Sequence, residues 1–162
     1  MSDEVEEYSF EGMPEVWCRH LLLCRSAWFD HRQPERGFSL GGVYVQVPTP
    51  DDGFPVVLDR PFVYFQLFGS PGEYTPRIRV VRVDKTGYDE EEELQLGEDG
   101  EPLEYPMPSG RPAVVDELSF VEQVAYRLDH LVFPEKGVYE FQLWLDGFDQ
   151  PAGRERIKIG EN

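Results

Sequence analysis

Three side chains that can bind a metal ion lie close together near the N-terminus. Cys18, His20 and Cys24 share one parity of a long apolar run, so an uninterrupted strand would place all three on one face. Cysteine and histidine are preferred ligands of zinc, but a structural site needs four ligands and the sequence offers no second Cys/His cluster. The sequence therefore favours two buried thiols on a central strand, about 20 Å apart and beyond disulfide reach, over a metal site.

Carboxylates are concentrated between Asp84 and Glu104, above all in Glu90, Glu91, Glu92 and Glu93. Calcium takes six to eight oxygen ligands, but the spacing here is not that of an EF-hand loop. Self-repulsion among the carboxylates favours a solvated, mobile loop, with Leu94 and Leu96 as a short strand inside it. The functional alternative is that these four glutamates form a docking surface for a basic partner.

The sequence lacks the local patterns that mark common catalytic centres. No strand-to-helix elbow surrounds a serine or cysteine, and Gly41-Gly42 has neither the lysine nor the hydroxyl residue of a phosphate-binding loop. A bend or bulge explains these two glycines better. Acidic pairs are too frequent in this chain to indicate a hydrolase. We therefore expect no enzyme activity, no catalytic residue and no cofactor.

Aromatic side chains offer a different kind of site. Tyr44, Tyr64 and Trp144 each have the parity opposite to the expected core face of their strands. If those strands lay in one sheet, the three rings would form an exposed patch able to bind a protein strand, a second copy or a sugar ring. Ordinary cross-strand packing is the alternative explanation.

Composition narrows the possible partners. The chain has 162 residues, and its 15 Lys and Arg against 32 Asp and Glu give a formal net charge of -17. This charge repels nucleic acid and anionic membrane surfaces, whereas it is compatible with a basic protein partner. No apolar run has membrane-spanning length, and the acidic N-terminus is unlike a secretory signal. We expect a cytoplasmic protein with a flexible acidic leader over residues 1–15 and one domain over residues 16–159.

The elements that would position these residues are short strands separated by turns. Alternation predicts strands at Val16 to Phe29, Phe38 to Val47, Val56 to Leu58, Phe62 to Phe68, Tyr74 to Asp84, Val138 to Asp146 and Arg154 to Ile159. A change of phase at Val80 and Val81 predicts a β-bulge. Residues 116–133 fit a helix or a strand, and the turn after them favours a strand. Seven to nine strands with long acidic and Pro-rich loops predict an all-β, antiparallel β-sandwich.

One strand resembles a known structural motif. Gly137-Val138-Tyr139-Glu140-Phe141 is similar to the tyrosine-corner strand of immunoglobulin-like domains. The resemblance implies that Tyr139 packs into the core and that its hydroxyl binds the backbone near the preceding turn.

The same region belongs to a wider resemblance that spans most of residues 16–159. It rests on Leu21-Leu22-Leu23-Cys24, on Phe54-Pro55-Val56-Val57-Leu58 leading into Phe62-Val63-Tyr64, and on Phe133-Pro134 through Asp146-Gly147. In these segments the chain resembles a family of small uncharacterised bacterial proteins, a domain of unknown function with an immunoglobulin-like β-sandwich. The matching positions are core residues and turns, so the resemblance implies a fold and no catalytic residues.

Together these observations predict a non-catalytic intracellular module that binds an unknown protein partner, and its charge is compatible with a basic one. The candidate interaction surface comprises Tyr44, Tyr64, Trp144, Glu90, Glu91, Glu92 and Glu93. The alternative is a β-sandwich that binds a small ligand, either a carbohydrate or calcium.

Overall fold

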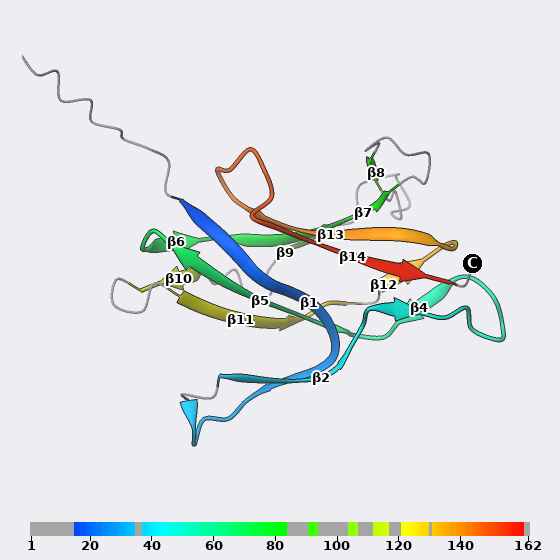
Figure 1. The fold of residues 1–162 in the computed structure, drawn as a ribbon, viewed down its shortest axis with the longest axis horizontal. Coiled ribbons are helices and arrows are strands. Elements are labelled where there is room, and N and C mark those ends of the chain that lie inside the picture. The colour runs from blue at the N-terminus through cyan, green and yellow to red at the C-terminus, as the bar shows by residue number, and fades with distance from the viewer. Residues whose placement is uncertain are drawn as a thin grey trace, which may run out of the picture.

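The structure is a computed structural model, and it describes residues 15–34, 37–83, 91–93, 104–106, 112–116, 121–129 and 131–160. These residues are almost entirely β-strand, arranged in antiparallel sheets that pack together, which confirms the predicted all-β sandwich (Figure 1). The ambiguous segment is a strand at Val121–Arg127, as the following turn indicated. No helix in the described part of the chain is long and apolar enough to span a membrane.

Two sheets form the body of the sandwich. The four-stranded sheet has the spatial order β11 (Val121–Arg127), β5 (Phe62–Gly69), β1 (Val16–Phe29) and β2 (Phe38–Val43). The six-stranded sheet has the order β3 (Gln46–Val47), β14 (Gly153–Ile159), β13 (Gly137–Leu145), β7 (Pro76–Val83) and β8 (Glu91–Glu93), with β9 (Glu104–Pro106) also paired to β7. All these pairings are antiparallel except that of β3 with β14, which is parallel.

Two short ladders complete the described structure. They pair β6 (Gly72–Tyr74) with β10 (Ala113–Val115), and β4 (Val56–Leu58) with β12 (Leu131–Phe133). The strand expected inside the Pro-rich connection is therefore present at its predicted position.

The core lies between the two main sheets. Alternate residues of each strand face inward, as period-two alternation requires. The four-stranded sheet contributes Val63, Phe65, Leu67, Val124 and Tyr126, and the six-stranded sheet contributes Ile78, Val80, Tyr139, Phe141, Leu143, Ile157 and Ile159. Burial of this apolar surface is the main stabilising contribution to the fold.

A β-bulge in β1 changes which residues face the core. Pairing with β5 shifts register between Arg19 and Leu22, and His20 has a left-handed backbone with φ 54°. Before the bulge Cys18 packs against the core, whereas after it Leu21 does. The expectation of one continuous parity through β1 is therefore wrong, because the inserted residue reverses the faces.

The far half of β1 folds back over the sheet to which it belongs. Residues 25–29 of β1 together with β2 form a two-stranded hairpin, which we call the arm. Figure 1 shows β1 curving round so that β2 runs below β11. The rings of Phe38 and Tyr64 lie 5.8 Å apart, and a Cβ placed on Gly37 would lie 2.6 Å from Oε1 of Gln123. The arm thus covers part of the outer face of the four-stranded sheet.

The strand expected from Phe38 to Val47 is divided between the two sheets. It breaks at Tyr44 and Val45, between the last residue of β2 and the first residue of β3, which joins β14; Gly42, just before the break, has a left-handed backbone with φ 61°. This confirms a bend at the glycine pair. The outward parity expected for Tyr44 is wrong, since its neighbours Val43 and Val45 are 43% and 75% exposed whereas Tyr44 packs against the core.

The bulge predicted in β7 is absent. This strand pairs with β13 without any register shift from Pro76 to Val83. Val80 and Val81 are both buried because both faces of the six-stranded sheet are covered at this point, with Val81 opposite Glu140 on the outer face. The successive apolar residues therefore reflect two-sided burial, which gives the same sequence pattern as a bulge.

The tyrosine-corner hydrogen bond is present. Tyr139 is fully buried, and its hydroxyl donates a hydrogen bond of 2.6 Å to the backbone carbonyl of Glu135, in the turn before β13. The ring of Phe133 lies 4.8 Å from that of Tyr139. These contacts confirm the expected position of Tyr139, while the immunoglobulin-like relationship as such stays a prediction.

Replacing Tyr139 with Phe tests the contribution of this bond. We expect the free energy of unfolding to fall by about 0.5 to 3 kcal/mol, because the ring keeps its packing while the Glu135 carbonyl loses its donor. Urea denaturation followed by circular dichroism measures the change. An unchanged midpoint would mean that the hydroxyl contributes nothing to stability.

Candidate functional site

The three aromatic residues of the predicted patch do not come together. Tyr64 lies on β5 of the four-stranded sheet, where the arm buries it to 6% exposure. Trp144 lies on β13 of the other sheet, and Tyr44 packs against the core between β2 and β3. Because the strands belong to different sheets, the condition on which the patch depended is not met.

The acidic candidates lie partly outside the described residues. Glu90 lies outside the described residues. Leu94 and Leu96, where a short strand was expected, also lie outside them. A short strand, β8, is described at Glu91–Glu93, where its backbone pairs with residues 81–83 of β7. Backbone pairing at this place was not expected from a run of glutamates.

The bulge in β1 separates Cys18, His20 and Cys24, the three side chains near the N-terminus whose types could bind a metal ion. Cys18 faces the core, Cys24 is fully buried with its thiol 3.7 Å from the Phe62 carbonyl, and His20 is exposed at the bulge. Burial raises the pKa of the Cys18 thiol to about 12 and also raises that of Cys24. Both cysteines are free, and no group of three metal-binding side chains occurs among the described residues.

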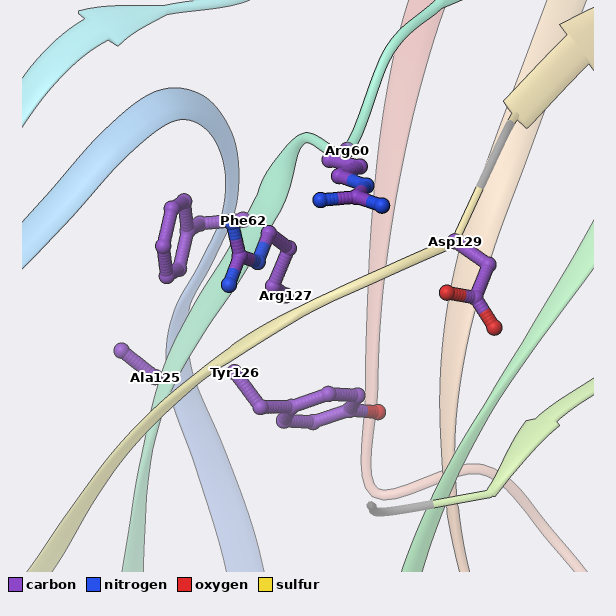
Figure 2. A pocket seen from close by; sticks show the side chains of 6 residues that line it. All are labelled: Arg60, Phe62, Ala125, Tyr126, Arg127 and Asp129. Carbon is purple, nitrogen blue, oxygen red and sulfur yellow. The ribbon is translucent and has the colours of Figure 1, made fainter.

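A pocket lies where β5 and β11 run side by side. Its volume is about 490 Å³, and it is lined by Arg60, Phe62, Ala125, Tyr126, Arg127 and Asp129 (Figure 2). The Arg127 guanidinium lies 5.8 Å from the centre of the Phe62 ring, a cation–π distance. Figure 2 shows both guanidinium groups on one side of the β11 trace, with Tyr126 and Asp129 on the other.

The charges of this pocket are unusual for so acidic a chain. Arg60 and Arg127 form no ion pair with any carboxylate of the described residues, and Asp129 lines the same pocket without bonding to either. Two guanidinium groups without a carboxylate partner among the described residues create a local positive field. The pocket is therefore suited to an anion, for which guanidinium offers paired donors.

The backbone at Arg60 is strained. Its φ of 49° lies in the left-handed region, which a non-glycine residue enters at a cost of about 1 kcal/mol or more. Arg60 also precedes Pro61, and a residue before proline is sterically pushed towards extended conformations. The fold therefore holds Arg60 at the pocket against two local preferences.

The register of β11 shows which of its backbone groups form hydrogen bonds with β5. The N–H of Leu128 donates to the carbonyl of Pro61 at 2.8 Å, and the antiparallel register places these two residues opposite each other. Hydrogen-bonded pairs then recur at every second residue, so Val124 and Tyr126 direct their N–H and C=O groups towards β5.

The intervening residues of β11 direct their backbone groups the other way. Gln123, Ala125 and Arg127 have N–H and C=O groups that point to the outer edge of the strand. Within the described ranges no strand pairs with this edge. We call it the β11 edge. Their side chains share one face of the sheet, the face on which Phe62 and Arg127 meet.

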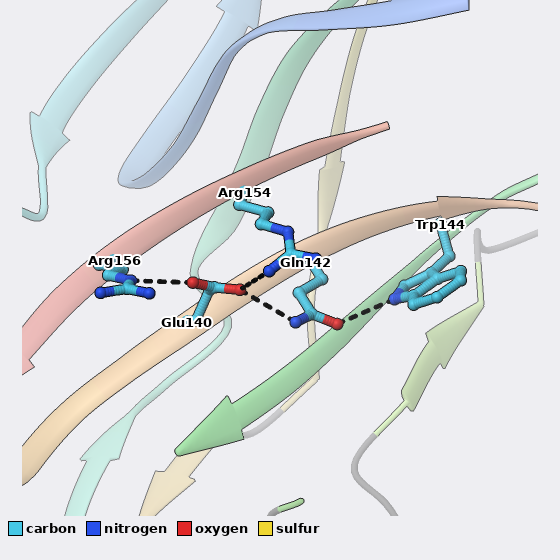
Figure 3. A network of polar contacts seen from close by, with 5 residues as sticks. All are labelled: Glu140, Gln142, Trp144, Arg154 and Arg156. Carbon is cyan, nitrogen blue, oxygen red and sulfur yellow. Dashed lines mark hydrogen bonds and ion pairs between the residues drawn. The ribbon is translucent and has the colours of Figure 1, made fainter. Parts of the chain in front are cut away.

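A second polar site occupies the outer face of the six-stranded sheet (Figure 3). The Glu140 carboxylate is 1% exposed and accepts bonds from Arg156 Nε at 2.9 Å, Gln142 Nε2 at 3.0 Å and Arg154 Nη1 at 3.4 Å. Gln142 Oε1 in turn accepts from Trp144 Nε1 at 3.0 Å. The carboxylate is thus satisfied within the fold, which identifies a structural network.

The sequence did not reveal either site. Glu140 and Gln142 alternate with core residues, a pattern that gives no sign that both are themselves buried. Arg60 and Arg127 are brought together by the pairing of β5 with β11, and no local pattern marks them. The only signal was the Arg60-Pro61 dipeptide after β4, which is a common sign of a turn.

Comparison with known proteins adds little. No family model matches the chain, and no curated protein matches it. Among solved structures, it is similar to the Pseudomonas fluorescens alkylpurine DNA glycosylase AlkC bound to DNA containing an abasic site analog, with 10% sequence identity and a TM-score of 0.39. The similarity covers 91% of this chain and 31% of that chain. A likeness at this level carries no argument about fold or function.

Proposed function

We propose that this chain is a non-catalytic, intracellular protein-interaction module that binds an extended segment of a partner protein along the β11 edge. The observation that supports this is the row of outward backbone groups at Gln123, Ala125 and Arg127, unpaired within the described ranges. A strand added at such an edge gains main-chain hydrogen bonds, and side chains on alternate positions supply specificity. The two free cysteines, Cys24 buried and Cys18 half-buried, fit a reducing compartment.

The net charge of the chain supports a basic protein as the partner. A chain of net charge -17 attracts a basic protein at long range and increases the association rate at low salt. The acidic segment that includes Glu90, Glu91, Glu92 and Glu93 is proposed to contribute to this attraction. Attraction at long range and recognition at the β11 edge are separate steps, so the segment that docks there need not itself be basic.

The alternative function is binding of a small ligand, and the pocket of about 490 Å³ is the observation in its favour. Its volume is in the range of small-molecule sites. Two guanidinium groups suit an anion better than calcium or a neutral sugar. The pocket also directly adjoins β11, so the same residues support the interaction module.

A displayed library of random linear peptides tests the proposal. The full chain is expected to enrich peptides rich in strand-forming residues. Ala125→Pro should weaken their binding about tenfold or more, because it removes an outward N–H and places a ring against the incoming strand. Ala125→Ser keeps the N–H and is the matched control. Failure to enrich any peptide, or equal binding by Ala125→Pro, would overturn the proposal.

A further inference from the structure

We infer that the partner segment carries an aspartate or glutamate beside Arg127, and that Arg60 and Arg127 together bind this carboxylate. The inference rests on the proposed function, because it assigns chemistry to the segment that docks at the β11 edge. It begins with the two guanidinium groups that line one pocket and form no ion pair with a carboxylate of the described residues. In a chain with 32 acids and 15 bases, such a pair is the opposite of the average surface.

The position of Arg127 makes it accessible from the β11 edge. It is exposed at the end of β11, and its side chain lies on the same sheet face as that of Ala125. Directly opposite residues on neighbouring strands have Cβ atoms about 5 Å apart, so an acidic residue on an added strand would meet the Arg127 side chain. Ala125 is the smallest side chain on this face of β11 and leaves the approach open.

Arg60 adds a second guanidinium, which lies on the same side of the β11 trace as that of Arg127 (Figure 2). It reaches the pocket from the turn before β5, and its left-handed φ of 49° is retained although the following residue is proline. Strain of this kind persists where the surrounding structure requires it, and it is found preferentially at binding sites. Two guanidinium groups can hold one carboxylate through several charge-assisted hydrogen bonds, with Phe62 keeping Arg127 in place.

A second copy that paired antiparallel about Ala125 would not supply this carboxylate. If two β11 edges paired antiparallel about Ala125, Arg127 would face Gln123 of the other copy, and glutamine is neutral. The chemistry of the pocket therefore favours a different protein that carries Asp or Glu at the matching position.

The test uses the peptides selected with the full chain. We expect an Asp or Glu at one fixed position among them. For a selected peptide, Arg60→Gln/Arg127→Gln should weaken binding about tenfold or more, and replacing the peptide's acid with its amide should cost nothing further in that variant. Arg32→Gln, which removes an exposed arginine from the turn of the arm, is the matched control and should leave binding unchanged.

Arg60→Gly separates binding from structure. Glycine adopts the left-handed backbone without strain, so the melting temperature is expected to stay equal or rise while peptide affinity falls. A structural role for Arg60 would instead lower the melting temperature.

The possible failures are distinguishable. Peptides that lose binding in Ala125→Pro but show no acid preference, and bind Arg60→Gln/Arg127→Gln equally well, would refute the carboxylate site and leave the proposed function standing. If no peptide is enriched, both proposals fail. Dimerisation through β11 without peptide, seen by analytical ultracentrifugation and lost in Ala125→Pro, would also refute a separate acidic partner.

Discussion

Replacing both Arg154 and Arg156 with Gln is expected to lower the free energy of unfolding by about 3 kcal/mol. Both arginines are about half exposed, whereas the Glu140 carboxylate that they bind is 1% exposed. Removing the two guanidinium groups leaves a buried negative charge with only the amide of Gln142 as a described donor. A buried charge without a counter-charge is among the most costly defects in a fold.

Neutralising Glu140, the buried partner of the two arginines, should lower the free energy of unfolding much less. Glu140→Gln keeps the shape of the side chain and an acceptor oxygen, and the two arginines can hydrate where they are. We expect a loss below about 1 kcal/mol, because no buried charge remains. The variant that combines all three substitutions should therefore be more stable than the double arginine variant, although it carries one more change.

Urea denaturation of the four proteins measures this coupling as a double-mutant cycle. Arg25→Gln, at an exposed arginine on the arm, is a suitable control for the loss of a surface charge. Equal losses for Glu140→Gln and the arginine pair, or no recovery in the combined variant, would show that the network does not depend on burial of the carboxylate.

Local patterns in the sequence predicted the strands well because alternation is a direct consequence of strand geometry. The segments around Phe65 and Phe141 bury every second residue in one core, and the structure has strands at both. The bond of the Tyr139 hydroxyl near the preceding turn is the one that the resemblance to a tyrosine-corner strand implied. These features depend on residues close together in the chain.

The mistaken assignments of exposed residues share a physical cause. Whether another segment covers the outer face of a sheet cannot be read from the residues of the strand itself. Val80 faces the core from the inner face of β7. Val81 lies on the outer face, opposite Glu140, and is buried as well. Tyr64 is buried because the arm folds over it. Alternation marks one buried face and gives no indication of the other.

The bulge at His20 and the pair formed by Arg60 and Arg127 were also beyond prediction. A left-handed backbone conformation is usually predicted from a glycine, but here His20 and Arg60 adopt it. Arg60 and Arg127 meet through pairing of strands that are far apart in the sequence. These positions depart from local preferences, so sequence patterns give little information at the site proposed here.

Proline substitution is expected to lower the free energy of unfolding by very different amounts at two neighbouring positions of β11. Val124→Pro should lower the free energy of unfolding by about 3 kcal/mol or more. It removes an N–H directed towards β5, leaves the facing carbonyl of Phe65 without its donor, and loses part of the packing of a side chain that is 5% exposed. Val124→Ala removes packing alone and is the control for that part of the loss.

Ala125→Pro, one residue further, should cost less than about 1 kcal/mol. The N–H that it removes points to the β11 edge, and an edge position of this kind accepts proline while the unfolded chain loses conformational freedom. Thermal and urea denaturation of the three variants give the comparison. Equal losses for the two prolines would mean that both N–H groups are hydrogen-bonded in the native state and that the β11 edge is already occupied. A small loss for Ala125→Pro beside a large one for Val124→Pro would support an edge whose outward groups remain open to a partner strand.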